Sequence, residues 1–156
     1  MGKQGLRYWE YKEHTADIKV VGYGNTIKRA FEALALGIMN IMYDVSKVEL
    51  KEEKEFEFES EDIISTLYDF LTQILDIFYI DNFAIGDVKI KNLRRKEKKV
   101  NNKKIRVWYC RFKIKGEKYN PEKHGRGKEV KAITYNEMNV EKVKEGLWKA
   151  ECVVDI

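Results

Sequence analysis

The sequence predicts one α+β domain, a mainly antiparallel sheet with two long helices packed on one face. Three observations predict it. Two apolar stretches repeat with the 3.6-residue period of a helix, at about residues 26–43 and 60–79, and most of the other segments alternate apolar with polar residues as strands do. A chain of 156 residues, 44% of them hydrophobic, is long enough to bury a core. We find no repeat or linker in the sequence and expect residues 1–156 to form a single domain.

The chain should begin with two short strands, at residues 8–12 and 18–23, on either side of a polar turn at residues 13–17 (EHTAD). The small and polar residues of this segment favour a turn.

The first helix should cover about residues 26–43, with Asn25 or Thr26 as its N-cap. Apolar residues occupy more than one side of it, so we expect it to be buried on more than one side.

After this helix, residues 45–59 alternate charged and apolar side chains, which predicts an amphipathic strand or hairpin. Ser60 is the expected N-cap of the second helix, which should run to about Tyr79. Asn82 and Gly86 mark its exit.

The rest of the chain should contain four strands, over residues 84–98, 103–116, 129–136 and 147–155. Asn101 and Asn102 are a plausible hairpin turn between the first two of these strands. The segment 116–128 is expected to be a long, basic loop.

The formal net charge is only +4, which excludes a wholly basic nucleic-acid clamp and a disordered acidic tail. The average conceals a strong asymmetry. Residues 89–131 contain 18 Lys and Arg against four Asp and Glu, whereas the other residues contain 12 against 22. The sequence therefore has a basic segment set in an acidic remainder.

Two cysteines, Cys110 and Cys152, are too few for a disulfide scaffold and have no metal-ligand spacing. Both lie among strand-type apolar residues, which favours buried, inert thiols. We find no apolar signal segment and no uncharged run near the roughly 20 residues of a bilayer span. We expect a soluble, cytoplasmic protein that does not contact a membrane.

The sequence contains none of the common catalytic or nucleotide-binding motifs: there is no P-loop, no G-x-G-x-x-G after a strand and no G-x-S-x-G. With only two histidines, a histidine-rich zinc site within one chain is excluded. We therefore do not expect an enzyme that uses covalent catalysis.

Carboxylates occur at two places that a fold can bring together. Asp17 ends the polar turn, and the apolar last strand finishes with Asp155 and the α-carboxylate of Ile156. If the turn lies beside the C-terminus, these groups converge and require a cation or protons. An oxygen-only ligand set favours Ca²⁺, Mg²⁺ or Mn²⁺. The alternative for Asp17 is an Asx-turn that closes onto local amides.

Five segments in order along the chain resemble the archease family: EHTADI at 13–18, TIKRAFEALALGIMNIM at 26–42, SEDIISTLYDFLTQILDIFYI at 60–80, EVKAITYNEMNV at 129–140 and the terminal WKAECVVDI. The resemblance implies a non-catalytic protein that activates the RtcB-type RNA ligase of tRNA splicing and RNA repair. It implies that this protein promotes GTP-dependent guanylylation of the ligase and multiple turnover. It also implies a divalent metal, Ca²⁺ most readily and Mn²⁺ or Mg²⁺ as alternatives, at Asp17, Asp155 and Ile156.

By the same resemblance the partner is the ligase, with tRNA or other RNA reached through it. We expect the chain itself to be a monomer or a weak homodimer. Candidate partner-binding residues are His14, His124, Lys131, Arg94 and Arg95. Structural alternatives stay open for these residues: His14 fixes the turn, His124 lies in a solvated loop, and residues 94–104 form a solvated basic hairpin. The alternative function is an RNA-binding or chaperone-like accessory module with a purely structural metal site.

Overall fold

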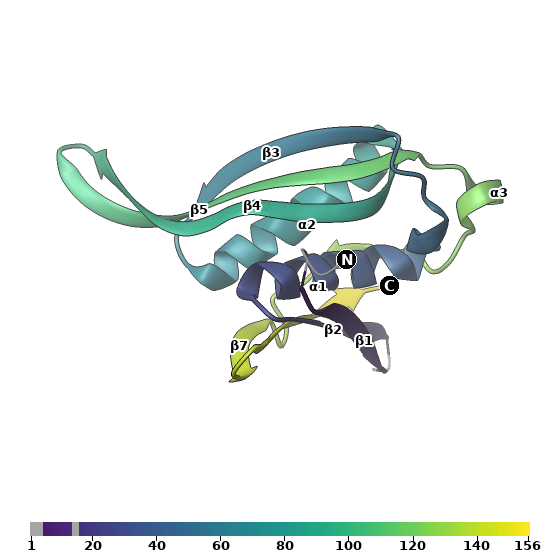
Figure 1. Ribbon diagram of the computed structural model, residues 1–156, viewed down its shortest axis with the longest axis horizontal. Helices are drawn as coiled ribbons and strands as arrows, with labels where there is room; N and C mark the ends of the chain where they lie inside the picture. Colours follow the sequence, from purple (N-terminus) through teal and green to yellow (C-terminus); the bar gives the residue numbers. More distant parts are fainter. Residues whose placement is uncertain (1–4, 14–15) are drawn as a thin grey trace.

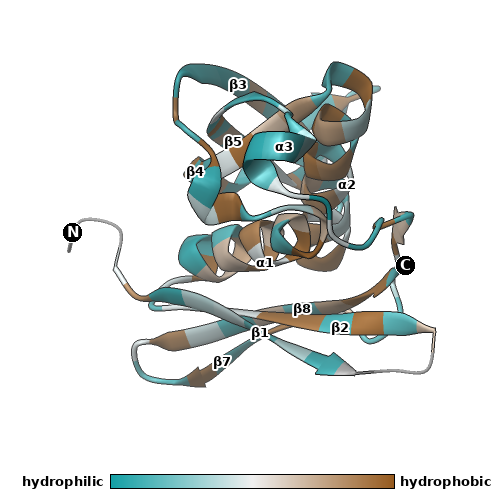
Figure 2. Ribbon diagram, turned by 90° about the vertical axis from the view of Figure 1, so that its right-hand side faces the viewer, coloured by the Kyte–Doolittle hydropathy of each residue, from teal (hydrophilic) through white to brown (hydrophobic). Residues whose placement is uncertain are grey.

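Two long helices lie between two antiparallel sheets in the computed structural model of the chain, which describes residues 5–13 and 16–156 (Figures 1 and 2). The elements in chain order are β1 (Arg7–Glu13), β2 (Asp17–Gly24), α1 (Ile27–Met42), the 3-10 turn η2 (Val45–Lys47), β3 (Glu52–Ser60), α2 (Ile63–Asp81), β4 (Phe83–Val100), β5 (Lys103–Lys118), α3 (Pro121–His124), β6 (Ala132–Ile133), β7 (Asn139–Lys144) and β8 (Leu147–Asp155).

The first sheet has the order β1-β2-β8-β6, with β7 also paired to β8, and the second has the order β3-β5-β4. The α+β class and the two long helices are confirmed. One detail is corrected: the strands divide between two sheets, and the helices are covered on both sides. Figure 2 shows β1, β2, β7 and β8 below α1, with α2 and the second sheet above it. The reason is that α1 is apolar around much of its circumference and can bury more than one face.

The contact between α1 and β2 is close because two glycines face the helix. A Cβ atom at Gly22 would lie 2.3 Å from the backbone nitrogen of Leu34, and one at Gly24 would lie 2.4 Å from that of Ala30. No larger residue fits at either position without moving the helix. Thr26, one of the two expected caps, accepts a hydrogen bond from the Arg29 N–H at 3.2 Å.

A buried carboxylate on α1 connects the two sheets. Glu32 is fully buried, pairs with Arg29 on its own helix, and receives Arg7 Nη1 from β1 at 3.0 Å. Its Oε2 accepts the backbone N–H of Ile90 on β4 at 2.7 Å. Arg7 also reaches Asp87 on β4 at 3.0 Å. Strands from both sheets thus meet at one helical residue.

Helix α2 begins two residues later than expected. Asp62 is the N-cap and accepts the Ser65 N–H at 2.8 Å. The expected cap, Ser60, is the last residue of β3, and its hydroxyl donates to Asp69. The helix ends at Asp81, two residues after the expected Tyr79, and the expected exit residue Asn82 is its C-cap, with a left-handed φ of 51°.

By length and hydropathy alone, α2 would be long enough to cross a membrane. Its apolar face instead packs in the core, with Leu67, Phe70 and Ile74 almost fully buried. In this structure α2 is therefore a core helix of a soluble globular protein.

The hairpin turn is confirmed: Asn101 and Asn102 have φ of 51° and 64°, as a two-residue turn requires. Three other expectations need correction. The loop expected at 116–128 is shorter, because β5 continues to Lys118 and α3 follows. The strand expected at 129–136 reduces to β6, and β7 was not expected. Strand β7 is mostly exposed and polar, so its local pattern is weak, and it is held by pairing with β8.

We predict that Glu32→Ala lowers the free energy of unfolding by about 3–5 kcal/mol, because it leaves two arginines and a backbone N–H without their buried partner. Urea unfolding followed by tryptophan fluorescence measures it. The matched control is Glu145→Ala, whose side chain is 94% exposed, and its change should stay within about 0.5 kcal/mol. Equal effects in the two variants would contradict this role of Glu32.

Candidate functional site

The start of β2 lies directly beside the end of β8. In the antiparallel register, Asp17 is the partner of Asp155 and Ile18 is the partner of Val154. Side chains of directly opposed residues lie about 4.5–5.5 Å apart at their Cβ atoms. The predicted juxtaposition of these two aspartates is therefore confirmed, whereas their binding of a cation stays a prediction.

The two aspartates lie on the face of the sheet that points away from the helices. Alternation along β8 sends Cys152 and Val154 into the helix-facing core, and Asp155 to the opposite face. Ile156 follows, half-buried and packed against the core. The C-terminus is therefore docked, as its apolar sequence predicted, and its α-carboxylate is held near the aspartate pair.

On its other side, the end of β8 is fixed by the segment around β6. The Lys131 N–H donates to the Asp155 carbonyl at 2.8 Å, and the Thr134 hydroxyl donates to the Val153 carbonyl at 2.7 Å. Asp155 is thus flanked by β2 on one side and by β6 on the other. This double pairing keeps the terminal residues from fraying.

A surface hollow of about 430 Å³ opens at this corner. It is lined by Ala16, Lys128, Glu129, Lys131 and Ile156. Lys131, a predicted partner-binding residue, therefore lines the hollow with the C-terminus. Lys128 and Glu129 were not singled out from the sequence, although Glu129 begins the EVKA segment that carried part of the family resemblance.

The corner offers oxygen ligands and no nitrogen or sulfur ligand that the structure describes. No cluster of three His, Cys, Asp or Glu side chains occurs among residues 5–13 and 16–156, so a cation at Asp17 and Asp155 needs further oxygen ligands. Two opposed carboxylates repel one another, and a bound cation removes that repulsion. The donor set fits a hard divalent ion.

Outside this corner, the other predicted partner-binding residues are scattered. Arg94 and Arg95 lie on β4, exposed and remote along the chain from the aspartates. His14 lies outside the described residues, as does the next residue of the same turn.

The surface role expected for His124 is wrong, and so is the solvated alternative, because the side chain has no exposed surface. Its Nδ1 accepts the Asn120 N–H at 3.0 Å, so Nε2 carries the proton that is donated to Glu117 Oε2 at 2.8 Å. Its ring lies against Tyr43 and Tyr119. His124 therefore holds the chain after β5 in place.

The two cysteines are free and buried, as the sequence predicted. Burial raises the pKa of the Cys110 thiol, and that of Cys152, to about 12. Neither thiol ionises near neutral pH, which disfavours a nucleophilic role.

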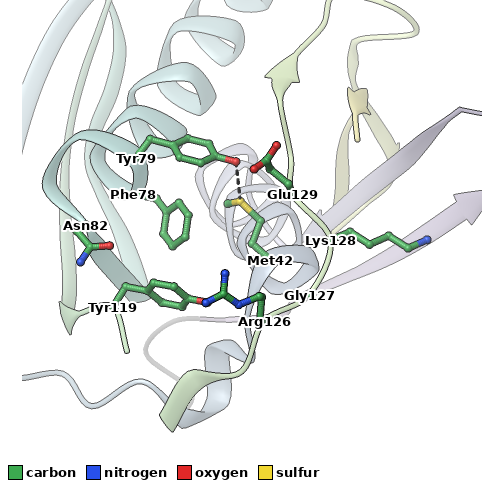
Figure 3. A pocket seen from close by; sticks show the side chains of 9 residues that line it. All are labelled: Met42, Phe78, Tyr79, Asn82, Tyr119, Arg126, Gly127, Lys128 and Glu129. Atoms are coloured by element: carbon green, nitrogen blue, oxygen red, sulfur yellow. Dashed lines mark hydrogen bonds between the residues drawn. The ribbon is translucent and has the colours of Figure 1, made fainter. Parts of the chain in front are cut away.

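A second hollow, of about 290 Å³, lies between the end of α2 and the segment after α3 (Figure 3). Phe78 and Tyr119 form aromatic walls, and Arg126 lines the side contributed by the later segment. The Tyr79 hydroxyl donates to the Val130 carbonyl at 2.7 Å, which ties the two segments together. The residues that line this hollow pack against one another, and their reactive groups do not converge on one point.

Comparison with known proteins gives a consistent result. The model of a family described as the archease protein family (MTH1598/TM1083) matches residues 9–156. Protein archease of Thermococcus kodakarensis is 46% identical over 97% of this chain and all of that protein, and that of Pyrococcus furiosus is 43% identical over the same shares. The solution structure of Methanobacterium thermoautotrophicum protein 1598 covers 98% of this chain and 99% of its own, with 32% identity and a TM-score of 0.72.

We predict a specific acid dependence from Glu117. Its pKa is held well below the ordinary value of 4.5 by the Lys123 ammonium first, then by the Glu49 N–H and by His124. The unfolded chain therefore takes up this proton first, so the stabilisation is complete above about pH 4.5 and is lost as the pH falls below it.

Glu117→Gln should lower the melting temperature at neutral pH and flatten the loss of stability between about pH 5 and pH 3. Thermal denaturation across this range measures both effects. Glu122→Gln, an exposed carboxylate of the same segment, is the matched control. Parallel pH curves for the wild type and Glu117→Gln would exclude this role.

Proposed function

Since the chain belongs to the archease family, we propose that it is a non-catalytic activator of an RtcB-type RNA ligase in tRNA splicing and RNA repair. The proposed action is to promote GTP-dependent guanylylation of the ligase and to allow multiple turnover. The proposed setting is the cytoplasm, and RNA is reached through the ligase.

One observation carries the proposal: the register places Asp17 opposite Asp155, at a docked C-terminus. Together with the Ile156 carboxylate, these groups are the ones that would hold a divalent cation, with Ca²⁺ first and Mn²⁺ or Mg²⁺ as alternatives. When bound, the cation supplies positive charge at a fixed place on the surface. Such a corner can engage acidic or phosphate groups of the ligase and its nucleotide.

The chain's own residues act by binding. A partner that binds one arrangement of the ligase more tightly shifts the population toward that arrangement by its differential affinity. The rigid corner suits this role because β2 and β6 pair with both edges of the end of β8. Lys131, at the same hollow, is placed to contact a carboxylate or a phosphate of the partner.

The second candidate is an RNA-binding or chaperone-like accessory module in which the cation is purely structural. The same geometry favours it, because one ion would tie the start of β2 to the end of β8. The two candidates differ in one respect: a structural ion is needed for stability, whereas the ion of an activator is needed for activation by a protein that is already folded.

We predict that the double variant Asp17→Asn/Asp155→Asn binds Ca²⁺ and Mn²⁺ at least about tenfold more weakly than the wild type. Asparagine keeps the shape of aspartate but removes its negative charge, so the variant loses two charged ligands. Isothermal calorimetry measures the affinity. Glu141→Gln changes an exposed carboxylate on neighbouring β7 and serves as the control. Undiminished binding in the double variant would reject the cation site.

We predict further that the wild-type chain accelerates guanylylation of the cognate ligase with GTP in the absence of RNA, and that Asp17→Asn or Asp155→Asn reduces this acceleration by about tenfold or more. Transfer of labelled GMP to the ligase measures it. The melting temperature of each variant is recorded alongside. Lower stability with full activation supports the structural candidate, and no acceleration by the wild type refutes the activator.

A further inference from the structure

The β4–β5 hairpin extends well past the third strand of its sheet. Strand β3 pairs with β5 only as far as Ser60, which lies opposite Trp108. The hairpin continues to the turn at Asn101 and Asn102, with Val100 opposite Lys103 in the last pair. Figure 1 shows this ribbon projecting at one end of the molecule.

Where β3 is present, its acidic residues neutralise the basic residues of β5. Arg111 pairs with Glu55 at 3.1 Å, and Lys113 pairs with Glu53 at 3.3 Å. The last acidic residue of this row, Glu59, holds Lys96 and Lys98 of β4 at 3.0 and 2.7 Å. The sheet proper is therefore internally compensated.

Beyond Ser60 no third strand of the described residues faces the hairpin, and Glu59 is the last residue of β3 that pairs with its cations. Residues 94–104 contain seven Lys and Arg and one acidic residue, Glu97. In the described part of the chain, six exposed cations of residues 94–106 form no ion pair: Arg94, Arg95, Lys99, Lys103, Lys104 and Arg106. By the register, Arg95, Lys99, Lys104 and Arg106 share one face of the ribbon with Glu97, and Arg94 and Lys103 lie on the other.

At the base of the ribbon, two arginines lie over aromatic rings. The Arg94 guanidinium is 5.0 Å from the centre of the Tyr109 ring, and that of Arg95 is 5.6 Å from the Trp108 ring. Stacking of this kind limits the motion of a guanidinium and leaves its N–H groups at the edge free to donate. Planar, pre-oriented donors suit phosphate oxygens.

We infer that the projecting β4–β5 ribbon is a binding surface for the phosphate backbone of RNA. Uncompensated cations on both faces of a narrow ribbon match a polyanion that can run along it, and half-buried aromatic rings at its base suit stacking with bases. A protein partner is less well matched, because the cores of protein interfaces are depleted of charge. The charge pattern is observed in the structure and does not depend on the proposed function; only the choice of RNA as the polyanion rests on that function.

The test is direct binding of fluorescein-labelled tRNA and of a single-stranded RNA to the full-length protein without ligase, followed by anisotropy at several salt concentrations. The tip variant replaces four cations outside the core with glutamine: Lys99, Lys103, Lys104 and Arg106. The control variant makes the same change of net charge at four exposed lysines elsewhere: Lys12, Lys47, Lys142 and Lys144.

The tip variant should bind RNA at least about tenfold more weakly at low salt. The slope of log affinity against log salt should fall by about 0.7 for each phosphate of a single strand that the variant no longer neutralises. The control variant should retain most of the affinity, and both variants should keep the wild-type melting temperature within a few degrees.

Three results would overturn the inference: no RNA binding by the wild type at low salt, equal weakening in the tip and control variants, or a tip variant that binds RNA normally but no longer binds the ligase. The last result would assign the ribbon to a protein partner. Because guanylylation is measured without RNA, failure here is distinguishable from failure of the proposed function.

Discussion

Glu32 is the residue through which the layers of the structure are tied together. Its carboxylate is fully buried and meets Arg29 from its own helix, Arg7 from β1 and the N–H of Ile90 from β4. A buried charge is tolerated only where such partners satisfy it. The Glu32 carboxylate reaches all of its partners only when β1, α1 and β4 lie in one relative arrangement. Apolar packing alone would allow the sheets to slide over the helix, whereas a hydrogen-bonded charge fixes their position.

The position of β2 on α1 in turn decides where the chemistry of the surface lies. Because Gly22 and Gly24 let the helix approach closely, β2 lies flat beneath α1 and its register with β8 brings Asp17 opposite Asp155. Both aspartates face away from the core; Asp155 is exposed, whereas Asp17 is half-buried. The fold therefore provides a rigid scaffold whose C-terminal edge is the candidate site.

Both long helices could be predicted from the sequence because their apolar periodicity is local and complete. The docked C-terminus could be predicted for a similar reason, since the chain is apolar up to Ile156. The division into two sheets could not, because strand pairing is not local and β7 is mostly exposed, with Val140 and Val143 its only apolar residues. Nor could the burial of His124, since its segment is highly charged and the rings that cover it, Tyr43 and Tyr119, come from elsewhere in the chain.

The near-neutral net charge of +4 is the sum over regions where acidic residues neutralise the cations and regions where they do not. On the sheet, the glutamates of β3 lie within ion-pair distance of the cations of β5. Five residues of β5, Lys103–Val107, continue past Trp108, and at about 3.3 Å per residue they carry the tip some 17 Å further. Exposed charges interact weakly beyond about 8 Å at physiological ionic strength. Glu59 of the sheet still pairs with Lys96 and Lys98 near the base of the ribbon, whereas the cations nearest the turn, Lys99, Lys103 and Lys104, form no ion pair in the part of the chain that the structure describes. The corner with Asp17 and Asp155 lies on the other sheet, so this small domain carries its candidate carboxylate site and its basic ribbon on different layers of the fold.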